Sequence, residues 1–303
     1  MNLNHLRIFI AVAEEKSITR AAHRLKLSQP AVSKELRLLE SALGVSLLQR
    51  QARGLELTRE GEVLADYAKR IFGLESEAER SLAEFRGLAR GRVVVGASST
   101  IGVYKFPEIL LHFHDRYPNI EVDLKLKNDK DIQDVLLDRQ CDLAYTGGFI
   151  EHRDMEAKPV LTDKLIVITP PGHPAALKQG LSIEQLRDYP FVLREVGSGM
   201  RAIFDRFLAS RNLNVNCILA LNDTEAVKRA VSLGLGLSVL SNLVVDAEIQ
   251  RGQLCMANVK DFPLERPIQR LMLRGRTESA AIRAFHNTLV GTLNRREHRT
   301  DHL

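Results

Sequence analysis

Two short amphipathic segments, joined by a link of only three residues, constrain the fold of the first sixty residues most. The first begins after Ser17, a residue suited to cap a helix, and carries a small apolar stripe that ends at Leu25. The second begins after Ser28 and has Pro30 in its first turn, where a missing N–H is tolerated. Two short helices joined by so tight a turn predict a helix-turn-helix.

The second segment has two faces of different chemistry. One is apolar at helical spacing and comprises Val32, Leu36, Leu39 and Leu43. The other offers hydrogen-bond donors and positive charge from Gln29, Ser33, Lys34 and Arg37. Such a polar face fits the DNA major groove, where Gln reads adenine and Arg reads guanine or holds phosphate. A three-helix bundle with a solvated polar face is the alternative.

The residues after this helix favour the nucleic-acid interpretation. Gly44 ends the helix, residues 51–54 form a basic turn, and residues 55–58 alternate as a strand does. This predicts a two-stranded wing with Arg50 and Arg53 near its tip, where arginine reaches phosphate or a narrow minor groove.

Charge is concentrated in the same module. Residues 1–59 contain ten basic and five acidic residues, whereas the rest of the chain contains 33 of each. The whole formal net charge of +5 therefore lies in the first fifth of the chain, which predicts a polyanionic partner at one end only.

A long helix is predicted over residues 59–88, with Thr58 as its cap. One series of residues recurs every seven positions and comprises Leu64, Ile71, Ala78 and Phe85. A second series lies three positions after the first and comprises Tyr67, Leu74, Ser81 and Leu88. This seam predicts dimerisation through a linker helix, since a helix so long would not bury its stripe within the chain. Packing on its own chain is the alternative.

From residue 92 strand and helix patterns alternate. Strands over 92–96, 120–126 and 142–146, with helices over 106–117 and 131–139, predict a parallel sheet with helices on both faces. A second unit has strands around 165–169, 191–193, 217–221 and 237–240, and a strand over 268–273 and a helix over 278–295 close the chain. The fold class is therefore α/β, with an N-terminal all-α winged helix-turn-helix, a linker helix and two α/β subdomains.

The predicted boundaries follow from these patterns. They are 1–59 for the winged helix-turn-helix, 60–91 for the linker and 92–303 for a regulatory domain. Subdomain I comprises 92–161 and 268–303, subdomain II comprises 162–267, and the chain crosses between them near 147–162 and 262–268.

Ligands of open α/β sheets bind beyond the carboxyl ends of the strands. Hydroxyls and free N–H groups at helix starts form anion-binding corners there. This predicts a site for a small anionic or carboxylate-bearing metabolite, formed by Ser98, Ser99, Thr100, Thr146, Ser198, Gly199, Met200, Arg201 and Thr224. Ordinary helix capping is the alternative for each hydroxyl, and capping of a sheet edge is the alternative for Arg201.

Other functional classes find little support. No catalytic motif, metal-ligand spacing or dinucleotide fingerprint occurs, so we expect neither an enzyme nor a cofactor. Cys141, Cys217 and Cys255 are read as reduced thiols, with a redox switch between the first two as the alternative. The absence of a signal peptide and of a long apolar run predicts a cytoplasmic protein without a membrane partner.

The N-terminal residues carry a specific resemblance. Ala21-Ala22, the run Leu27-Ser-Gln-Pro-Ala-Val-Ser33, and Leu43-Gly44-Val45 occur at the spacing of the DNA-binding domain of LysR-type transcriptional regulators. Leu48 replaces the family's usual aromatic, a change at a core position. The resemblance implies that Gln29, Pro30 and Ser33 lie at the DNA and that Arg50 contacts its backbone.

The rest of the chain resembles the same family, with its dimerising linker helix and its effector domain like a periplasmic binding protein. The resemblance implies double-stranded DNA, a small-molecule effector and a homo-oligomer, dimer or tetramer, as partners, and RNA polymerase where the protein activates. Two alternatives remain open, a cytoplasmic solute-binding protein and an α/β enzyme with a basic helical appendage. Neither the effector, the target genes nor the sign of regulation follows from the sequence.

Overall fold

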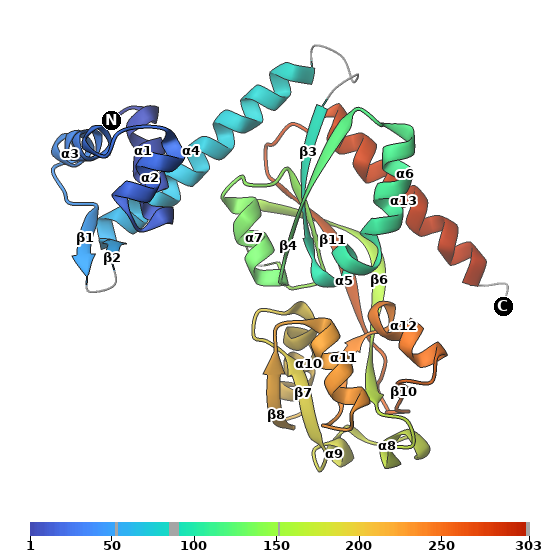
Figure 1. The fold of residues 1–303 in the computed structure, drawn as a ribbon. Helices are drawn as coiled ribbons and strands as arrows, with labels where there is room; N and C mark the ends of the chain where they lie inside the picture. Colours follow the sequence, from blue (N-terminus) through green and yellow to red (C-terminus); the bar gives the residue numbers. More distant parts are fainter. Residues whose placement is uncertain (52–53, 85–90, 151, 301–303) are drawn as a thin grey trace. The chain divides into compact units, whose positions relative to one another are not determined.

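The computed structural model describes residues 1–51, 54–84, 91–150 and 152–300. The chain divides into two compact units, residues 1–79 with 137–140, and residues 80–136 with 141–303. The first is mainly helical and the second is an α/β structure (Figure 1).

The N-terminal unit begins with three helices, α1 (Leu3–Glu15), α2 (Ile18–Leu25) and α3 (Gln29–Leu43). Ser17 caps α2 by accepting a hydrogen bond from the Arg20 N–H at 3.4 Å, and Ser28 caps α3 through the Ala31 N–H at 3.3 Å. The helices enclose one core, which includes Phe9, Val12, Ala21, Ala22, Val32, Leu36 and Leu39. The predicted helix-turn-helix is thus confirmed.

The prediction that Leu43 belongs to the buried apolar face of α3 is wrong. Leu43 is 37% exposed, because it is the last residue of the helix and the chain turns away at Gly44. The buried face of α3 therefore comprises Val32, Leu36 and Leu39.

A two-stranded wing follows α3. Strands β1 (Leu48–Gln51) and β2 (Gly54–Leu57) are antiparallel, with Leu48 opposite Leu57. The Thr58 hydroxyl then donates to the Ser46 carbonyl at 2.7 Å and accepts from the Gly61 N–H at 3.0 Å, which starts the next helix.

Helix α4 (Arg59–Glu84) packs one side on the N-terminal core and leaves another side open. Ala65 and Ala68 are buried, whereas the apolar residues that are more than half exposed are Val63, Tyr67, Leu74 and Leu82. In the predicted seam, Leu64 and Ile71 are half-buried, Ala78, Tyr67 and Leu74 are exposed, and Phe85, Leu88 and the Ser81 side chain lie outside the described part of the structure.

The second unit is built on a mixed sheet in the order β10-β6-β11-β5-β3-β4, with β9 also pairing with β6. Its strands are β3 (Gly91–Ser98), β4 (Ile120–Lys127), β5 (Leu143–Thr146), β6 (Met155–Thr169), β9 (Ser238–Ser241), β10 (Cys255–Met256) and β11 (Leu264–Leu273). A separate parallel pair comprises β7 (Pro190–Arg194) and β8 (Asn216–Leu221). The helices are α5 (Ser99–Tyr104), α6 (Phe106–Arg116), α7 (Asp129–Leu137), α8 (Pro174–Leu177), α9 (Ile183–Leu186), α10 (Gly199–Ala209), α11 (Thr224–Ser232), α12 (Asn242–Gln250) and α13 (Ala280–Thr300).

The predicted parallel pairing is confirmed for β3 with β4 and for β3 with β5. The crossing strands differ from the prediction, because β6 is 15 residues long and pairs antiparallel with the full length of β11. The register shifts between Ile268 and Gln269, where β6 carries one extra residue at Val160. The predicted crossing at 147–162 therefore contains the first half of β6, which the ladder with β11 holds as a strand from Met155 onward.

Two hydrophobic cores divide the second unit into two lobes. The first lobe is packed around Phe106, Phe113, Tyr145 and Phe285, between the sheet and helices α6 and α13. The second lobe has its own core, which includes Val167, Phe191, Phe204, Val227 and Leu240. Strands β6 and β11 contribute residues to both cores, so they join the lobes (Figure 1). None of the helices in the described ranges combines the length and the apolar character needed to cross a bilayer.

Phe285 fills the centre of the first lobe, with ring centroids 5.3 Å from Phe113 and 5.8 Å from Phe106. We expect Phe285→Ala to lower the free energy of unfolding by about 3–5 kcal/mol, because the cavity it leaves loses both transfer and packing energy. Urea denaturation followed by circular dichroism measures this. The exposed Glu121→Ala is the control and should cost less than about 1 kcal/mol. Equal costs for both would contradict the assigned core.

Candidate DNA-binding surface and effector site

The polar side of α3 faces away from the N-terminal core. Gln29, Pro30, Lys34 and Arg37 are exposed and Ser33 is half-buried. The Arg37 Nε donates to the Ser33 carbonyl oxygen at 3.2 Å, which holds the arginine along the helix. The structure thus gathers the predicted contact residues of this helix on one accessible surface, at the start of α3.

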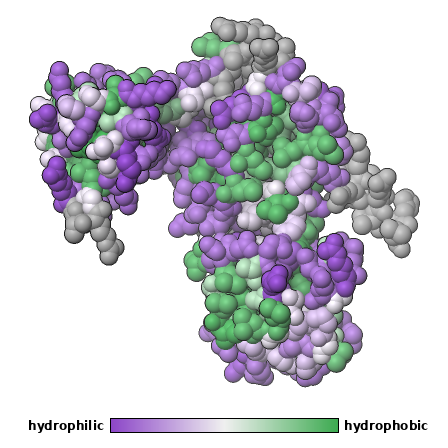
Figure 2. All heavy atoms as spheres, in the orientation of Figure 1, coloured by the Kyte–Doolittle hydropathy of each residue, from purple (hydrophilic) through white to green (hydrophobic). Residues whose placement is uncertain are grey.

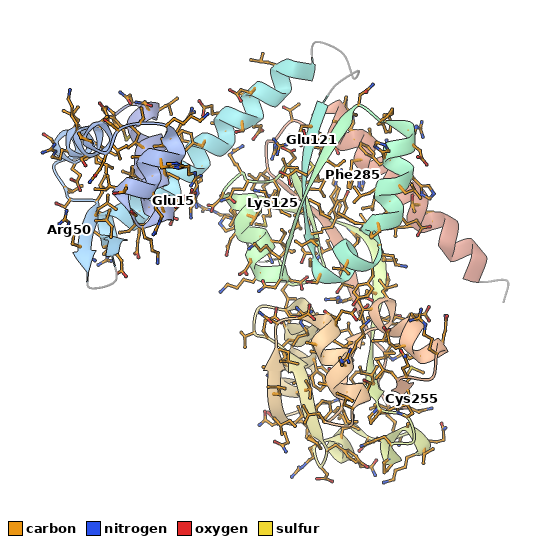
Figure 3. The ribbon with its side chains drawn as sticks, in the orientation of Figure 1. Glu15, Arg50, Glu121, Lys125, Cys255 and Phe285 are labelled. Atoms are coloured by element: carbon orange, nitrogen blue, oxygen red, sulfur yellow. The ribbon has the colours of Figure 1, made fainter. Side chains whose placement is uncertain are left out.

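Two arginines of α2 lie close to glutamates, so α2 adds little free positive charge to the surface. Arg24 forms an ion pair with Glu14 at 2.6 Å, and Arg20 lies 3.6 Å from Glu15. Among the described residues, Lys34, Arg37 and Arg50 form no ion pair, so their charge is available to a polyanion. Figure 3 shows Arg50 on the wing, apart from Glu15. The other predicted wing residue, Arg53, lies outside the described residues.

A buried ion pair lies where the two lobes join. Asp163 on β6 and Arg266 on β11 are register partners, both side chains are fully buried, and Arg266 Nε lies 2.8 Å from Asp163 Oδ2. Arg266 Nη2 also donates to Thr100 Oγ1 at 3.1 Å, and Nη1 lies 3.5 Å from the Gly147 carbonyl oxygen. The guanidinium therefore ties the crossing strands to the first lobe.

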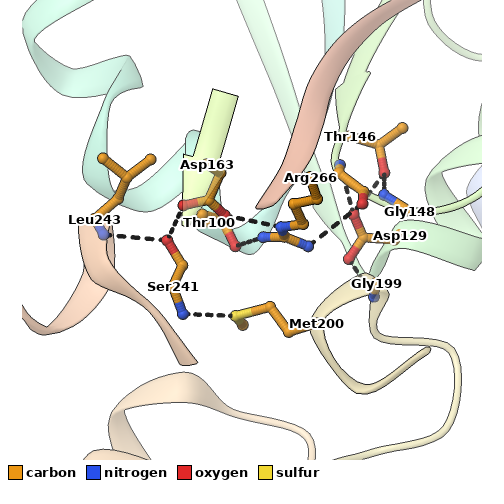
Figure 4. A network of polar contacts seen from close by, with 11 residues as sticks. Thr100, Asp129, Thr146, Gly148, Asp163, Gly199, Met200, Ser241, Leu243 and Arg266 are labelled. Atoms are coloured by element: carbon orange, nitrogen blue, oxygen red, sulfur yellow. Dashed lines mark hydrogen bonds and ion pairs between the residues drawn. The ribbon is translucent and has the colours of Figure 1, made fainter. Parts of the chain in front are cut away.

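A second carboxylate, Asp129, lies on the other side of Arg266 (Figure 4). Its Oδ1 accepts from the Thr146 hydroxyl at 2.6 Å and from the Gly147 N–H at 2.9 Å, and its Oδ2 accepts from the Gly199 N–H at 2.7 Å. Burial acts to raise the pKa of Asp129, but the charge of Arg266 and these hydrogen bonds hold the pKa below its usual range. Asp129 is therefore an ionised carboxylate.

Ser241 extends the network into the second lobe. Its hydroxyl donates to Asp163 Oδ1 at 2.6 Å and accepts from the Leu243 N–H at 3.1 Å. Its own N–H lies 3.3 Å from the Met200 sulfur. The network in Figure 4 therefore draws on both lobes.

Several residues of the predicted effector site converge on this network. They are Thr100, Thr146, Gly199 and Met200. Ser98 and Ser198, each 1% exposed, lie at the starts of α5 and α10, and their hydroxyls make no hydrogen bond to any described residue. Ser99 is the half-buried first residue of α5.

Arg201 and Thr224 lie apart from the network. Arg201 Nε is 2.7 Å from Asp205 Oδ1 on the next turn of α10, and Arg201 Nη1 donates to the Arg194 carbonyl. The Thr224 hydroxyl accepts from Arg194 Nη1 at 2.5 Å. Both side chains are engaged within the second lobe, and their role in effector binding stays a prediction.

The sequence reasoning missed Asp129, Asp163, Ser241 and Arg266. Arg266 lies in the predicted crossing at 262–268 and Asp163 one residue beyond the crossing at 147–162, but nothing local in the sequence indicates that the two residues pair. Asp129 was missed because the helix that it begins was predicted to start at residue 131.

A cavity of about 540 Å³ opens beside the network, within the size range of small-molecule sites. The Gly147–Gly148 turn, which meets Asp129 and Arg266, forms part of its wall. Residues from both lobes line it, among them Phe149, Ile203, Pro267 and Gln269. None of the predicted effector-site residues lines this cavity, so it lies next to the predicted site and does not coincide with it.

Metal-ligating side chains and thiols are the other groups that could carry chemistry. No cluster of His, Cys, Asp and Glu suited to a metal ion occurs within the described ranges. The three cysteines are free, and burial raises the pKa of Cys141 to about 12, whereas Cys217 is exposed on β8. A buried thiol with so high a pKa forms little nucleophilic thiolate.

A charged helix-turn-helix followed by a two-lobed α/β unit defines a DNA-binding regulator with a ligand-binding domain. Residues 3–62 match the family described as "Bacterial regulatory helix-turn-helix protein, lysR family", and residues 86–294 match "LysR substrate binding domain". The chain belongs to the LysR family of transcriptional regulators.

Relatives extend over nearly the whole chain. The RuBisCO operon transcriptional regulator of Allochromatium vinosum is 34% identical over 290 residues, 96% of each chain. The regulatory domain of Synechocystis CcmR, solved in complex with 2-PG, is 31% identical with a TM-score of 0.63, and covers 66% of this chain and 96% of that one. Full-length CbnR, solved with its target DNA, shares the fold with a TM-score of 0.71 at 22% identity, over 96% of this chain and 100% of that one.

The Asp163–Arg266 pair gives a test of the junction. We expect Asp163→Asn to lower the free energy of unfolding by about 3–5 kcal/mol, because it breaks a fully buried ion pair and puts an amide where Arg266 Nε and the Ser241 hydroxyl both need an acceptor. Thermal and urea denaturation measure the loss. Asp205→Asn, at the exposed partner of Arg201, should cost less than about 1 kcal/mol. The double variant Asp163→Asn with Arg266→Met should lose less stability than the two single losses added together, and a purely additive loss would argue against the pairing.

Proposed function

We propose that this regulator binds specific DNA sites as a homodimer, through the polar face of α3 and the wing, and responds to a small anionic effector held between the two lobes. The division into a DNA-binding module over 1–59, a linker over 60–91 and a regulatory domain over 92–303 belongs to the proposal. The free positive charge on α3 and β1, next to neutralised arginines on α2, is the observation that carries the DNA-binding part.

The residues divide into two roles at the DNA. Gln29 and Ser33 lie in the first turns of α3, where a recognition helix meets base edges. Lys34, Arg37 and Arg50 supply positive charge for the phosphates, with Arg50 reaching from the wing. Pro30 fixes the backbone at the start of α3, and Arg53 is retained as a proposed wing contact.

The open side of α4 supports dimerisation. Val63, Tyr67, Leu74 and Leu82 form an exposed apolar stripe at helical spacing, which a second copy of α4 would cover. A second apolar area lies on β8, where Ile218 is 46% exposed and Leu219 38% (Figure 2). Two such areas on one chain allow a dimer to assemble further into a tetramer.

The effector is proposed to be a small anion or carboxylic acid. Helix starts at Ser98 and Ser198, each with a buried hydroxyl free to donate, supply two anion-binding corners. The neighbour CcmR, crystallised with 2-PG, supports the same class. Ser98, Ser99, Thr100, Thr146 and residues 198–201 are proposed as its surroundings, with Thr224 at the edge.

Regulation is proposed to act by a shift between lobe arrangements. An effector that binds one arrangement of the lobes more tightly increases the population of that arrangement. The linker helix then transmits the change to the DNA-binding modules. We infer binding without catalysis, in the cytoplasm, with RNA polymerase as a further partner where the protein activates. A solute-binding protein and an α/β enzyme receive no comparable support.

Variants of the DNA surface test the division of roles. Arg50→Ala should weaken binding to all sequences and reduce the salt slope by about one, whereas Gln29→Ala and Ser33→Ala should lose about 1–3 kcal/mol of discrimination between sites. Gel shifts and footprints on the promoter beside the gene, over a range of salt, measure both. Arg251→Ala, an exposed arginine of the second lobe, should change neither. Site-independent losses from all three variants would contradict the assignment.

Charge placed on the α4 stripe tests the dimer. We expect Leu74→Glu, and Tyr67→Glu separately, to raise the dimer dissociation constant at least about a hundredfold, because each buries a carboxylate between apolar helices. Light scattering after gel filtration measures the mass. Leu177→Glu, at a more exposed leucine of α8, serves as the control. A wild-type mass for both α4 variants would show that another surface forms the dimer.

A further inference from the structure

The Asp129 carboxylate lies against the start of α10, where we propose that an anionic group of the effector binds. The start of α10 presents its Gly199 N–H for an anion, and the Asp129 carboxylate from the first lobe accepts that hydrogen bond at 2.7 Å. We propose that Asp129 is a built-in carboxylate that closes the cleft and competes with an acidic effector for the same donors. This inference rests on the proposed function and concerns the regulation of the same site.

The bonding of Asp129 fits a latch between the lobes. Two of its hydrogen bonds, from Thr146 and Gly147, anchor it to the first lobe, and the third, from Gly199, reaches the second lobe. Thr146 is fixed in turn, since its hydroxyl accepts from the Gly148 N–H at 3.2 Å. A carboxylate with three short hydrogen bonds and a nearby guanidinium is a strongly held group.

The glycines around Asp129 show how closely the lobes meet. A Cβ added at Gly199 would lie 2.8 Å from Asp129 Cγ and 2.9 Å from Gly148 Cα. A Cβ added at Gly148 would lie 2.8 Å from Asp129 Cβ. Only glycine at these two positions lets the start of α10 approach the carboxylate.

The net charge of the buried network determines whether a further anion can bind to it. Arg266 provides one positive charge to two buried carboxylates, Asp129 and Asp163, so the three side chains sum to one negative charge. A further anion would meet two carboxylates among buried side chains, which is strongly unfavourable. An acidic effector must therefore displace Asp129 and take over the Gly199 N–H, beside the unpaired Ser98 and Ser198 hydroxyls.

Removal of the carboxylate tests this competition. We expect Asp129→Ala and Asp129→Asn to lower the dissociation constant for inorganic phosphate, and for 2-phosphoglycolate, at least about tenfold relative to the unmodified chain. Titration calorimetry on the full-length protein measures the affinities. The control is Asp131→Ala, which removes the same charge from an exposed position of the same helix and should leave both affinities within about twofold.

Hydrogen exchange separates the latch from a simple charge effect. The Gly199 amide should exchange slowly in the unmodified protein and faster in both Asp129 variants, while the Phe285 peptide keeps its protection and so reports an intact fold. Gly199→Ala should also expose this segment, because its Cβ meets the carboxylate. Unchanged anion affinity in folded Asp129 variants, or an equal gain in Asp131→Ala, would overturn the proposal.

The anion-affinity test of Asp129 can succeed or fail independently of the test of DNA binding. A gain in anion affinity without any site-specific footprint would support the latch and refute the proposed regulator. A specific footprint without any gain in anion affinity would refute the latch alone.

Discussion

The ion pair between Arg266 and Asp163 is the interaction on which the two-lobed unit depends. Both side chains are fully buried on adjacent crossing strands, and a pair of this kind tolerates burial only if its remaining donors and acceptors are satisfied. Thr100, Gly147 and Ser241 supply those partners, from three different parts of the unit. The need to satisfy two buried charges therefore fixes where the lobes, the strands and the helix starts lie relative to each other.

The junction around that pair is held by polar groups, unlike the interior of either lobe. Each lobe has its own hydrophobic core, so neither needs the other for most of its burial. Hydrogen bonds to Asp129, Asp163 and Arg266 cross the junction, together with the bond from the Lys130 N–H to the Gly197 carbonyl at 3.1 Å. Directional contacts between two separately packed lobes concentrate their connection in a small number of polar groups.

The sequence predicted the elements with strong local patterns. Ser17 and Ser28 start the helices they were expected to start, because helix caps are chosen within a few residues along the chain. The parallel strands β3, β4 and β5 were found since apolar runs and helices alternate there. Residues 155–164 were missed as part of a strand because their pairing partner, β11, lies a hundred residues away.

The same difference between local and long-range information applies to the candidate sites. The face of α3 was predictable because helical spacing alone separates Val32 and Leu36 from Gln29 and Lys34. Ser198 and Gly199 were found from a strand-to-helix turn, which is local. Asp129 and Arg266 acquire their meaning only from contacts across the fold, so no local pattern marked them.

The extra residue at Val160, opposite the step from Ile268 to Gln269, interrupts the ladder between β6 and β11 inside the segment that joins the lobes. A bulge loosens and twists a strand pair without ending it. Rotation of one lobe against the other can thus be taken up as bending of a continuous two-stranded ribbon. Bending at this point would leave the ladder on either side of Val160 paired, so the connection between the lobes would stay continuous.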